Sequence, residues 1–118
     1  MPVFQAYSGT DEPRFANEVE RECAKILDYY GVPWAYEPHT FVLERDAEGN
    51  VVEAFTPDFY LPEQNLYLEL TTMKQSLVTR KNRKLRKLRE RYGEVVTLVA
   101  REDFQRLVER YGSSTNGR

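Results

Sequence analysis

The spacing of apolar and polar residues predicts three amphipathic helices. Residues 13–31 carry apolar side chains at steps of three and four, and Gly31 ends this run. Such spacing places the apolar side chains on one face of a helix, and glycine is common just after a helix end. The expected apolar face consists of Phe15, Val19, Cys23, Ile26 and Tyr30. The same spacing predicts helices over residues 76–92 and 101–112.

Segments rich in aromatic and β-branched residues alternate with these helices and predict strands. The four segments are residues 33–46, 51–61, 66–73 and 95–100. A glycine-containing turn at residues 47–50 joins the first two, so the first three segments are expected to form a three-stranded hairpin meander. The fourth strand is reached through a helix, and such a strand usually lies parallel to a neighbour. The sequence therefore predicts an α/β protein with the order helix, three strands, helix, strand, helix and a mixed central sheet.

Two acidic residues interrupt the apolar pattern of the second and third predicted strands. A turn around Glu63 and Gln64 would place Asp58 directly opposite Glu69 in an antiparallel hairpin. Alternate residues of a strand share a face, so this pairing separates an apolar set from a polar set. The apolar set is Phe55, Phe59, Leu61, Leu66, Leu68 and Leu70, and the polar set is Thr56, Asp58, Tyr60, Tyr67, Glu69 and Thr71. A slip by one residue would expose the leucines, which fixes the parity of the register.

Like charges directly opposite each other destabilise a sheet, because their Cβ atoms are only about 4.5–5.5 Å apart. A divalent cation would remove that cost. Carboxylate oxygens suit the hard ions Mg²⁺ and Mn²⁺, and Mg²⁺ typically takes one or two carboxylates together with several waters. The alternative is a polar strand surface with two unrelated acids, one of them paired with Lys74 or an arginine. The sequence of this hairpin alone leaves both interpretations open.

The composition is typical of one folded domain without a membrane segment. The chain has 118 residues, of which 41% are hydrophobic and 31% are charged. Residues 1–112 are expected to form a single domain, followed by a disordered tail at residues 113–118. No apolar run approaches the roughly 20 residues of a membrane span, and the first residues lack a signal-peptide pattern, so we expect a cytoplasmic protein with no membrane partner. Cys23 is the single cysteine, which rules out an intramolecular disulfide and a cysteine-based zinc site.

Positive charge is concentrated in residues 80–91. This segment holds eight of the 17 Lys and Arg residues and one of the 19 acidic residues, so its net charge is +7 and that of the rest is −9. A field confined to one face can recruit a polyanion, and basic side chains neutralise DNA phosphates without reading the sequence. The expected DNA contacts are Arg80, Arg83, Lys84, Lys87 and Arg91, with Lys81, Arg86 and Arg89 in the same block. The alternative is a solvated helix face, although such faces usually pair bases with acids at helical spacing.

The segments around Asp58 and Glu69 resemble the bipartite motif of the PD-(D/E)XK nuclease superfamily. The letters TPD end one predicted strand, ELT stand in the next, and the order of predicted elements is similar to the restriction-endonuclease-like core. Residues 19–31 are also similar to the opening helix of archaeal Holliday junction resolvases, in which an early glutamate reaches the metal. The resemblance implies a Mg²⁺- or Mn²⁺-dependent DNA endonuclease with metal ligands at Asp58, Glu69, the Leu70 carbonyl and Glu20. It also implies a homodimer, because junction resolvases act on two strands.

One position departs from the superfamily motif. Thr71 stands where the motif has a lysine, and a hydroxyl has no positive charge to stabilise the negative charge that develops at phosphorus. Lys81 falls on the apolar stripe of the predicted helix 76–92, so it should face the sheet, and its long side chain can extend back to the acid pair. Lys74 is the second choice, because strand parity turns it away from the acidic face unless the strand has ended. The predicted catalytic set is Asp58, Glu69, Lys81, Thr71 and Lys74.

Three functions fit this pattern. The first is a metal-dependent endonuclease that hydrolyses DNA phosphodiester bonds. The second is a nucleic-acid-binding or interaction module that kept the fold and lost catalysis with the lysine. The third is an interaction domain that uses the basic helix on an acidic protein partner. Divalent-ion binding that depends on both acids distinguishes the first from the second, and the third predicts no nucleic-acid binding at physiological salt.

Overall fold

The structure is a computed structural model that describes residues 4–71, 74–94 and 96–112. The predicted tail at 113–118 and the predicted strand residues 72–73 and 95 lie outside these ranges. The elements in chain order are α1 (Glu18–Tyr29), β1 (Ala35–Tyr36), β2 (Phe41–Arg45), β3 (Val51–Phe55), β4 (Phe59–Leu61), β5 (Leu66–Thr71), α2 (Gln75–Tyr92), β6 (Val96–Ala100) and α3 (Arg101–Gly112). The predicted α/β class is confirmed. Among the described residues, no helix combines the length and the apolar character of a membrane span.

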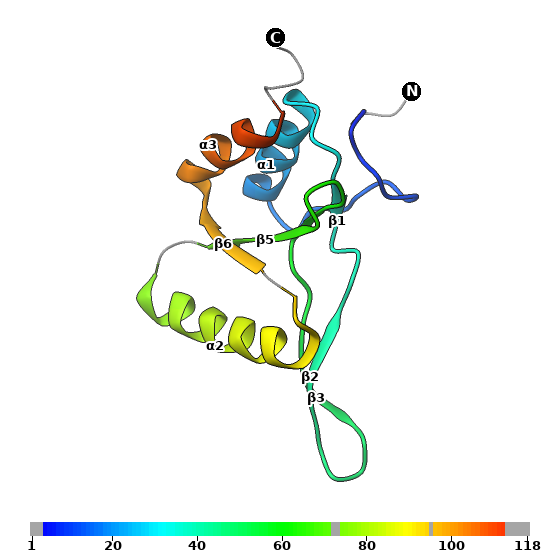
Figure 1. Cartoon of the computed structure of the whole chain (residues 1–118), viewed down its shortest axis with the longest axis vertical. Helices are drawn as coiled ribbons and strands as arrows, with labels where there is room; N and C mark the ends of the chain where they lie inside the picture. Colours follow the sequence, from blue (N-terminus) through cyan, green and yellow to red (C-terminus); the bar gives the residue numbers. More distant parts are fainter. Residues whose placement is uncertain (1–3, 72–73, 95, 113–118) are drawn as a thin grey trace.

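The central sheet is mixed, as predicted. Its strand order is β1-β4-β5-β6, in which β1, β4 and β5 are antiparallel neighbours and β6 lies parallel to β5. Helix α2 connects the two parallel strands. In Figure 1, α1 and α3 lie on one side of β5 and β6, and α2 lies on the other side. The C-terminal ends of β5 and β6 meet at one edge of the sheet, where Thr71 pairs with Ala100 directly before α3.

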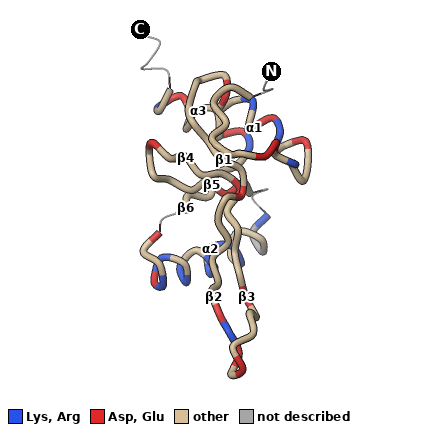
Figure 2. Tube along the Cα trace, turned by 90° about the vertical axis from the view of Figure 1, so that its right-hand side faces the viewer, with Lys and Arg blue, Asp and Glu red and all other residues tan. Residues whose placement is uncertain are grey.

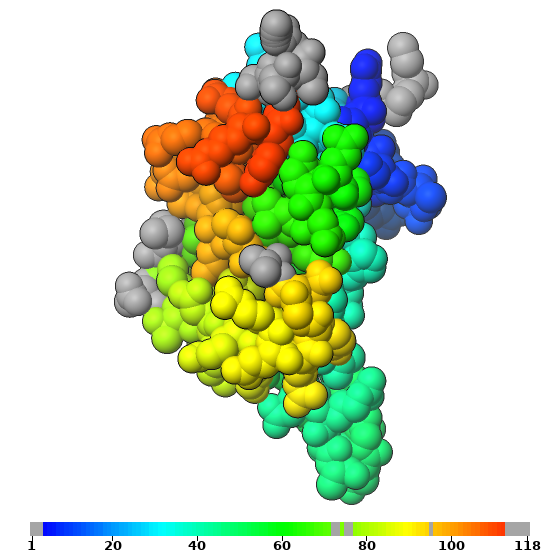
Figure 3. All heavy atoms as spheres, viewed as in Figure 1, coloured from blue at the N-terminus to red at the C-terminus, as the bar shows by residue number. Residues whose placement is uncertain are grey.

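The predicted three-stranded meander is wrong, because two of its strands are broken. The first divides into β1 and β2, where Glu37 has a φ of 46° that is outside the strand region and Pro38 follows. The second divides into β3 and β4 around Pro57, which has no backbone N–H to donate to a ladder. Strands β2 and β3 consequently form a separate two-stranded sheet. This hairpin projects away from the rest of the molecule (Figure 1, Figure 3).

Two hydrophobic clusters hold these layers together. The larger one packs α1 and α3 against the central sheet and includes the fully buried rings of Phe59 and Phe104. The smaller one joins the β2–β3 hairpin to α2 through Leu43, Phe55 and Leu88. Phe55 was predicted to share the buried face of Phe59. This prediction is wrong, because the chain breaks between β3 and β4 and Phe55 lies in the second cluster. The other members of the predicted apolar set lie in the larger cluster or against it.

Helix α1 begins at Glu18, later than predicted, and its buried face differs from the predicted one. Its N-cap is Asn17, whose side-chain oxygen accepts a hydrogen bond of 2.9 Å from the Glu20 backbone N–H. Such a cap satisfies a backbone donor that has no partner inside the helix. Glu20 is consequently buried on the same face as Cys23, whereas Val19 is 42% exposed. The prediction that Val19 is buried is wrong, whereas Glu20, which the resemblance implies as a metal ligand, is buried.

The two C-terminal helices confirm the predicted ranges. Helix α2 ends at Tyr92, where Gly93 has a left-handed φ of 73° and donates its N–H to the Arg89 carbonyl. Glycine suits this position because it has no Cβ to clash in the left-handed conformation. The buried side chain of Leu88 faces the hairpin cluster. Helix α3 has the predicted bounds and starts directly after the last strand.

Candidate active site

Two buried carboxylates face each other across strands β4 and β5. The ladder pairs Phe59 with Leu68. The next position in the same register sets Asp58 opposite Glu69, which confirms the predicted pairing. The Asp58 backbone N–H donates to Glu69 Oε1 at 3.1 Å, and the Leu70 N–H donates to Asp58 Oδ2 at 2.9 Å. Only 8% of Asp58 and 7% of Glu69 is exposed to solvent.

Lys81 extends to this pair from helix α2. Its Nζ lies 2.9 Å from Glu69 Oε2 and 2.5 Å from the Leu70 carbonyl oxygen. The prediction that Lys81 faces the sheet and extends to the acid pair is confirmed by its contact with Glu69. Lys74 lies outside this group as the exposed N-cap residue of α2. Thr71 is buried at the end of β5 and lines the same cavity as the acids.

The acid pair and Lys81 line a cavity of about 350 Å³. Its walls combine the end of β5 with residues from the first turns of α1, α2 and α3. The lining residues are Asn17, Val19, Glu20, Asp58, Glu69, Leu70, Thr71, Leu77, Lys81, Arg101 and Glu102. First turns of helices carry a partial positive charge from unpaired N–H groups. The cavity thus places the two buried carboxylates beside the first turns of three helices, two of which also contribute the acids Glu20 and Glu102 to the lining.

Glu20 lines the cavity, but its carboxylate has other partners. Glu20 Oε1 accepts hydrogen bonds from the Ala16 backbone N–H at 2.9 Å and from the Tyr36 hydroxyl at 2.6 Å. Burial and this hydrogen bond raise the pKa of Tyr36, so its hydroxyl remains a donor. Among the described residues, no three His, Cys, Asp or Glu side chains form a group that could hold a metal ion. Glu20 is therefore not clustered with Asp58 and Glu69, and its role as a metal ligand stays a prediction.

Burial of two carboxylates side by side raises the pKa of both. Loss of solvent, and then the neighbouring charge of Glu69, raise the pKa of Asp58 to about 8. Burial also raises the pKa of Glu69, while the hydrogen bond and the charge of Lys81 lower it. The pair therefore retains a proton at neutral pH, and additional positive charge would release it.

The donor atoms of this pair suit a hard divalent ion. Two carboxylates and the Leu70 carbonyl are oxygen donors, which Mg²⁺ and Mn²⁺ prefer, and Mg²⁺ completes its shell with waters and phosphate oxygens. The cavity beside the pair has room for those ligands. The Lys81 ammonium already lies on two of these oxygens, so the position attracts positive charge. The residues present therefore fit the ion that the sequence predicts.

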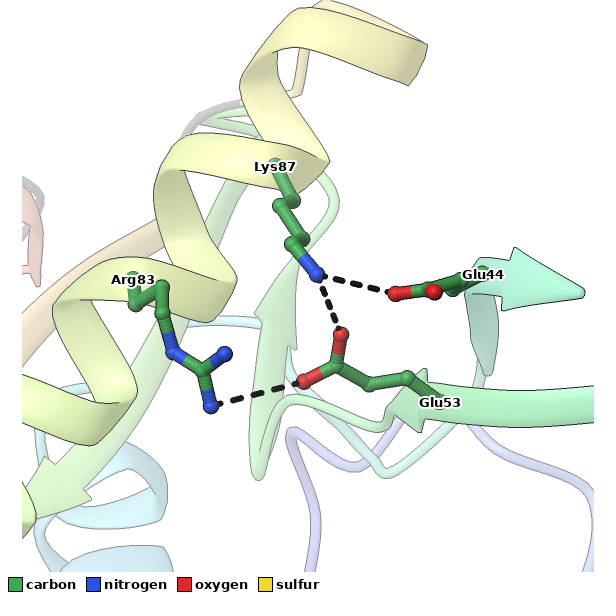
Figure 4. Close-up of polar contacts among 4 residues, drawn as sticks. All are labelled: Glu44, Glu53, Arg83 and Lys87. Carbon is green, nitrogen blue, oxygen red and sulfur yellow. Dashed lines mark hydrogen bonds and ion pairs between the residues drawn. The ribbon is translucent and has the colours of Figure 1, made fainter.

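Apart from Lys81, the cations of α2 fall into two groups. Lys87 Nζ lies 2.8 Å from Glu53 Oε1 and 3.2 Å from Glu44 Oε1 (Figure 4). Arg83 Nη2 lies 4.0 Å from Glu53 Oε2. Two of the predicted DNA contacts therefore hold the hairpin on α2. Within the described part of the chain, no ion pair engages Arg80, Lys84, Arg86, Arg89 or Arg91, and Figure 2 shows positive charges along the length of α2.

Sequence reasoning missed Arg101. It is the first residue of α3 and lines the cavity, and its side chain is 43% exposed with Nε 3.0 Å from Glu22 Oε1. The sequence contained a signal for this position, because Arg101 directly follows the predicted strand 95–100. Parallel neighbours end at the same edge of a sheet, and polar residues just beyond those ends are frequent in binding sites.

No family model, curated protein or solved structure matches this chain. A functional assignment therefore depends on the geometry and the charges of the cavity.

Proposed function

We propose that this protein is a Mg²⁺- or Mn²⁺-dependent endonuclease of the PD-(D/E)XK superfamily, which hydrolyses DNA phosphodiester bonds. The observation that supports it most is the buried pair Asp58 and Glu69, with the Lys81 ammonium 2.9 Å from Glu69 Oε2. Two facing carboxylates cost stability, because burial and like charge both oppose their ionisation. The order of α1, antiparallel β4 and β5, α2 and parallel β6 supports a restriction-endonuclease-like core.

Each residue of the acid pair and its neighbours has a separate role in this proposal. Asp58, Glu69 and the Leu70 carbonyl would hold the ion. When bound, the ion supplies a water of lowered pKa and polarises the scissile phosphate. Lys81 supplies the positive charge that Thr71 lacks, so the lysine of the motif would have moved from β5 to α2.

DNA backbone phosphates would lie along α2 and at the cavity. Five cations of α2 without an acidic partner among the described residues are suited to this contact: Arg80, Lys84, Arg86, Arg89 and Arg91. Arg101 presents a half-exposed guanidinium at the cavity, and guanidinium groups bind phosphate with two parallel hydrogen bonds. Such contacts predict affinity that falls steeply with salt and depends little on base sequence.

The test is calorimetric titration of Mn²⁺, with cleavage of branched and linear DNA followed in the same samples. The wild type is expected to bind Mn²⁺ and to cleave DNA. Glu69→Gln should lose both properties, because it removes one carboxylate charge from the ligand set. Glu53→Gln is the matched control, since Glu53 also pairs with a lysine of α2 but does not line the cavity. Cleavage by Glu69→Gln at the wild-type rate would overturn the proposal.

A nucleic-acid-binding module without catalysis is the second candidate function. Thr71 provides no charge at the motif position, and Glu69 already holds the Lys81 ammonium. This candidate predicts salt-sensitive DNA binding that Glu69→Gln leaves unchanged, and no cleavage with either metal. The samples described above therefore distinguish the two functions.

A further inference from the structure

The Lys81 ammonium lies on two of the three groups that the proposed metal would use. Its Nζ is 2.9 Å from Glu69 Oε2 and 2.5 Å from the Leu70 carbonyl oxygen. The third group is Asp58, whose Oδ2 accepts a hydrogen bond from the Leu70 N–H. A cation of the protein itself therefore occupies the contacts that a bound ion would need.

We propose that Lys81 and the divalent ion compete for Glu69 Oε2 and the Leu70 carbonyl, so that Lys81 is an internal counter-ion that the metal displaces. This inference rests on the proposed function and adds an order of events to it. The ion enters first, and its entry releases Lys81 toward the substrate phosphate. The same lysine thus stabilises the metal-free site and assists the loaded one.

Two cations on these oxygens at contact distance would repel each other. A Mg²⁺ ion lies about 2.0–2.1 Å from its oxygen ligands, and a charged N–H donor lies about 2.7–2.9 Å from its acceptor. An ion and an ammonium on the same two oxygens would therefore be within a few ångströms of each other. Their repulsion is much stronger in a buried site than in water. Departure of Lys81 from these oxygens would relieve that repulsion.

The Lys81 side chain can rotate away from the acid pair and remain in the cavity. Its side chain is 28% exposed, and the flexible stem of a lysine can rotate without moving the helix backbone. The cavity continues from the acid pair to Arg101, so the released ammonium stays within it. A DNA phosphate in the cavity would accept that ammonium. Metal and DNA should therefore bind cooperatively, because the metal frees the ammonium that a DNA phosphate then binds.

The first test compares Mn²⁺ affinity in the absence of DNA for the wild type and two lysine variants. Lys81→Met keeps the apolar stem and removes the competing charge, so it should bind Mn²⁺ about tenfold more tightly or better, the equivalent of one charge-assisted hydrogen bond. Lys84→Met is the matched control, because it removes one positive charge from the same helix without a contact to the acid pair. Its affinity should change much less.

The outcomes separate this inference from the proposed function. Tighter binding by Lys81→Met than by Lys84→Met supports competition. Equal affinity of Lys81→Met and the wild type overturns competition but leaves the metal site intact. Absence of Mn²⁺ binding in all three folded proteins overturns the proposed metal site and the competition with it.

A second measurement uses the unmodified chain and does not depend on the folding of a variant. Acetylation of lysines by acetic anhydride is followed by peptide mass spectrometry, with and without Mg²⁺ at a concentration that calorimetry shows to be saturating. Mg²⁺ should increase the acetylation rate of Lys81 several-fold and leave that of Lys84 unchanged. An unchanged rate at Lys81 in the metal-loaded protein would overturn the displacement of this lysine.

Discussion

The two lysine–glutamate clusters of this protein share their chemistry but differ in electrostatics. In the cavity, the two facing carboxylates Asp58 and Glu69 are at most 8% exposed, and Lys81 contacts Glu69. On the hairpin, Glu53 is shared by two cations of α2. Burial raises the pKa of Asp58 to about 8, whereas the hydrogen bond from Lys87 lowers the pKa of Glu53.

This difference separates a site with too little positive charge from a structural contact. The hairpin cluster has enough positive charge for its acids and lies beside the small hydrophobic cluster that joins the hairpin to α2. Its function is therefore to hold the hairpin in place. The cavity has more carboxylates than cations, and burial makes that shortage of positive charge costly. Such a site gains stability from an additional cation, and perturbed acids of this kind are frequent at functional sites.

The largest expected effect is that of Asp58→Asn, which should lower activity and raise stability. An asparagine oxygen can still accept the hydrogen bond from the Leu70 N–H, and the substitution removes the carboxyl group whose ionisation burial and Glu69 oppose. We expect DNA cleavage to fall by at least about 100-fold, a typical cost of losing one group that stabilises charge in a transition state. The free energy of unfolding at pH 8 should rise by about 1–3 kcal/mol.

Urea denaturation of the wild type and the variant measures that stability. Glu53→Gln is the control from the other cluster, because it removes an acid whose pKa is lowered rather than raised. It should reduce stability slightly and leave cleavage unchanged. A loss of stability in Asp58→Asn at pH 8 would contradict the interpretation that the acid pair is strained.

The pH dependence of stability should be opposite for the two clusters. Folding raises the pKa of Asp58 from 3.8 to about 8, so the folded state holds this proton more tightly than the unfolded state. The contribution of Asp58 is therefore fully present below about pH 4 and is lost as the pH rises to about 8, by several kcal/mol. Glu53 has a lowered pKa, so its contribution is lost instead as the pH falls through that lowered value.

Urea denaturation at intervals of pH from 4 to about 8.5 checks this dependence. Asp58→Asn should flatten the decline between about pH 5 and 8, because the titrating group is gone. A decline of the same size in the variant would mean that another group causes it.

The smallest expected effect concerns the salt dependence of DNA binding. Arg80→Ala and Arg91→Ala remove cations that have no ion pair among the described residues, so each should reduce the slope of log affinity against log salt by about 0.9. Lys87→Ala should reduce the slope less, because Glu53 and Glu44 already hold this ammonium. Fluorescence anisotropy with a labelled duplex at several salt concentrations gives the slopes. Equal losses for Lys87 and Arg91 would show that the hairpin acids release the lysine to DNA.

Most elements and the central feature of the cavity could be predicted from local patterns. The helical spacing that predicted α2 and α3 depends on neighbouring residues only, and these bounds are confirmed. The register of Asp58 and Glu69 follows from the burial of the leucines on the other face of the same strands. Lys81 was predicted at the acids because it shares the apolar stripe of its helix, and its 2.9 Å contact with Glu69 confirms that position.

Features that depend on the path of the chain could not be predicted in this way. Strand breaks at Pro38 and Pro57 separate the hairpin from the central sheet and move Phe55 to a second cluster. The break at Pro57 also places Glu53 beside Lys87 of α2, which is distant in sequence. A proline in the sequence indicates that a strand is interrupted. The direction in which the chain continues depends on the surfaces against which it then packs.

The sequence by itself determined the periodic elements, the facing acids and the lysine that turns toward them, because each follows from a repeat of two or of 3.6 residues. Only the tertiary structure decided that Glu20 bonds Tyr36, that Arg101 lines the cavity and that part of α2 is occupied by the hairpin. These contacts join residues far apart in the chain, and their geometry is set by the packing of whole elements against one another. No local period encodes that packing.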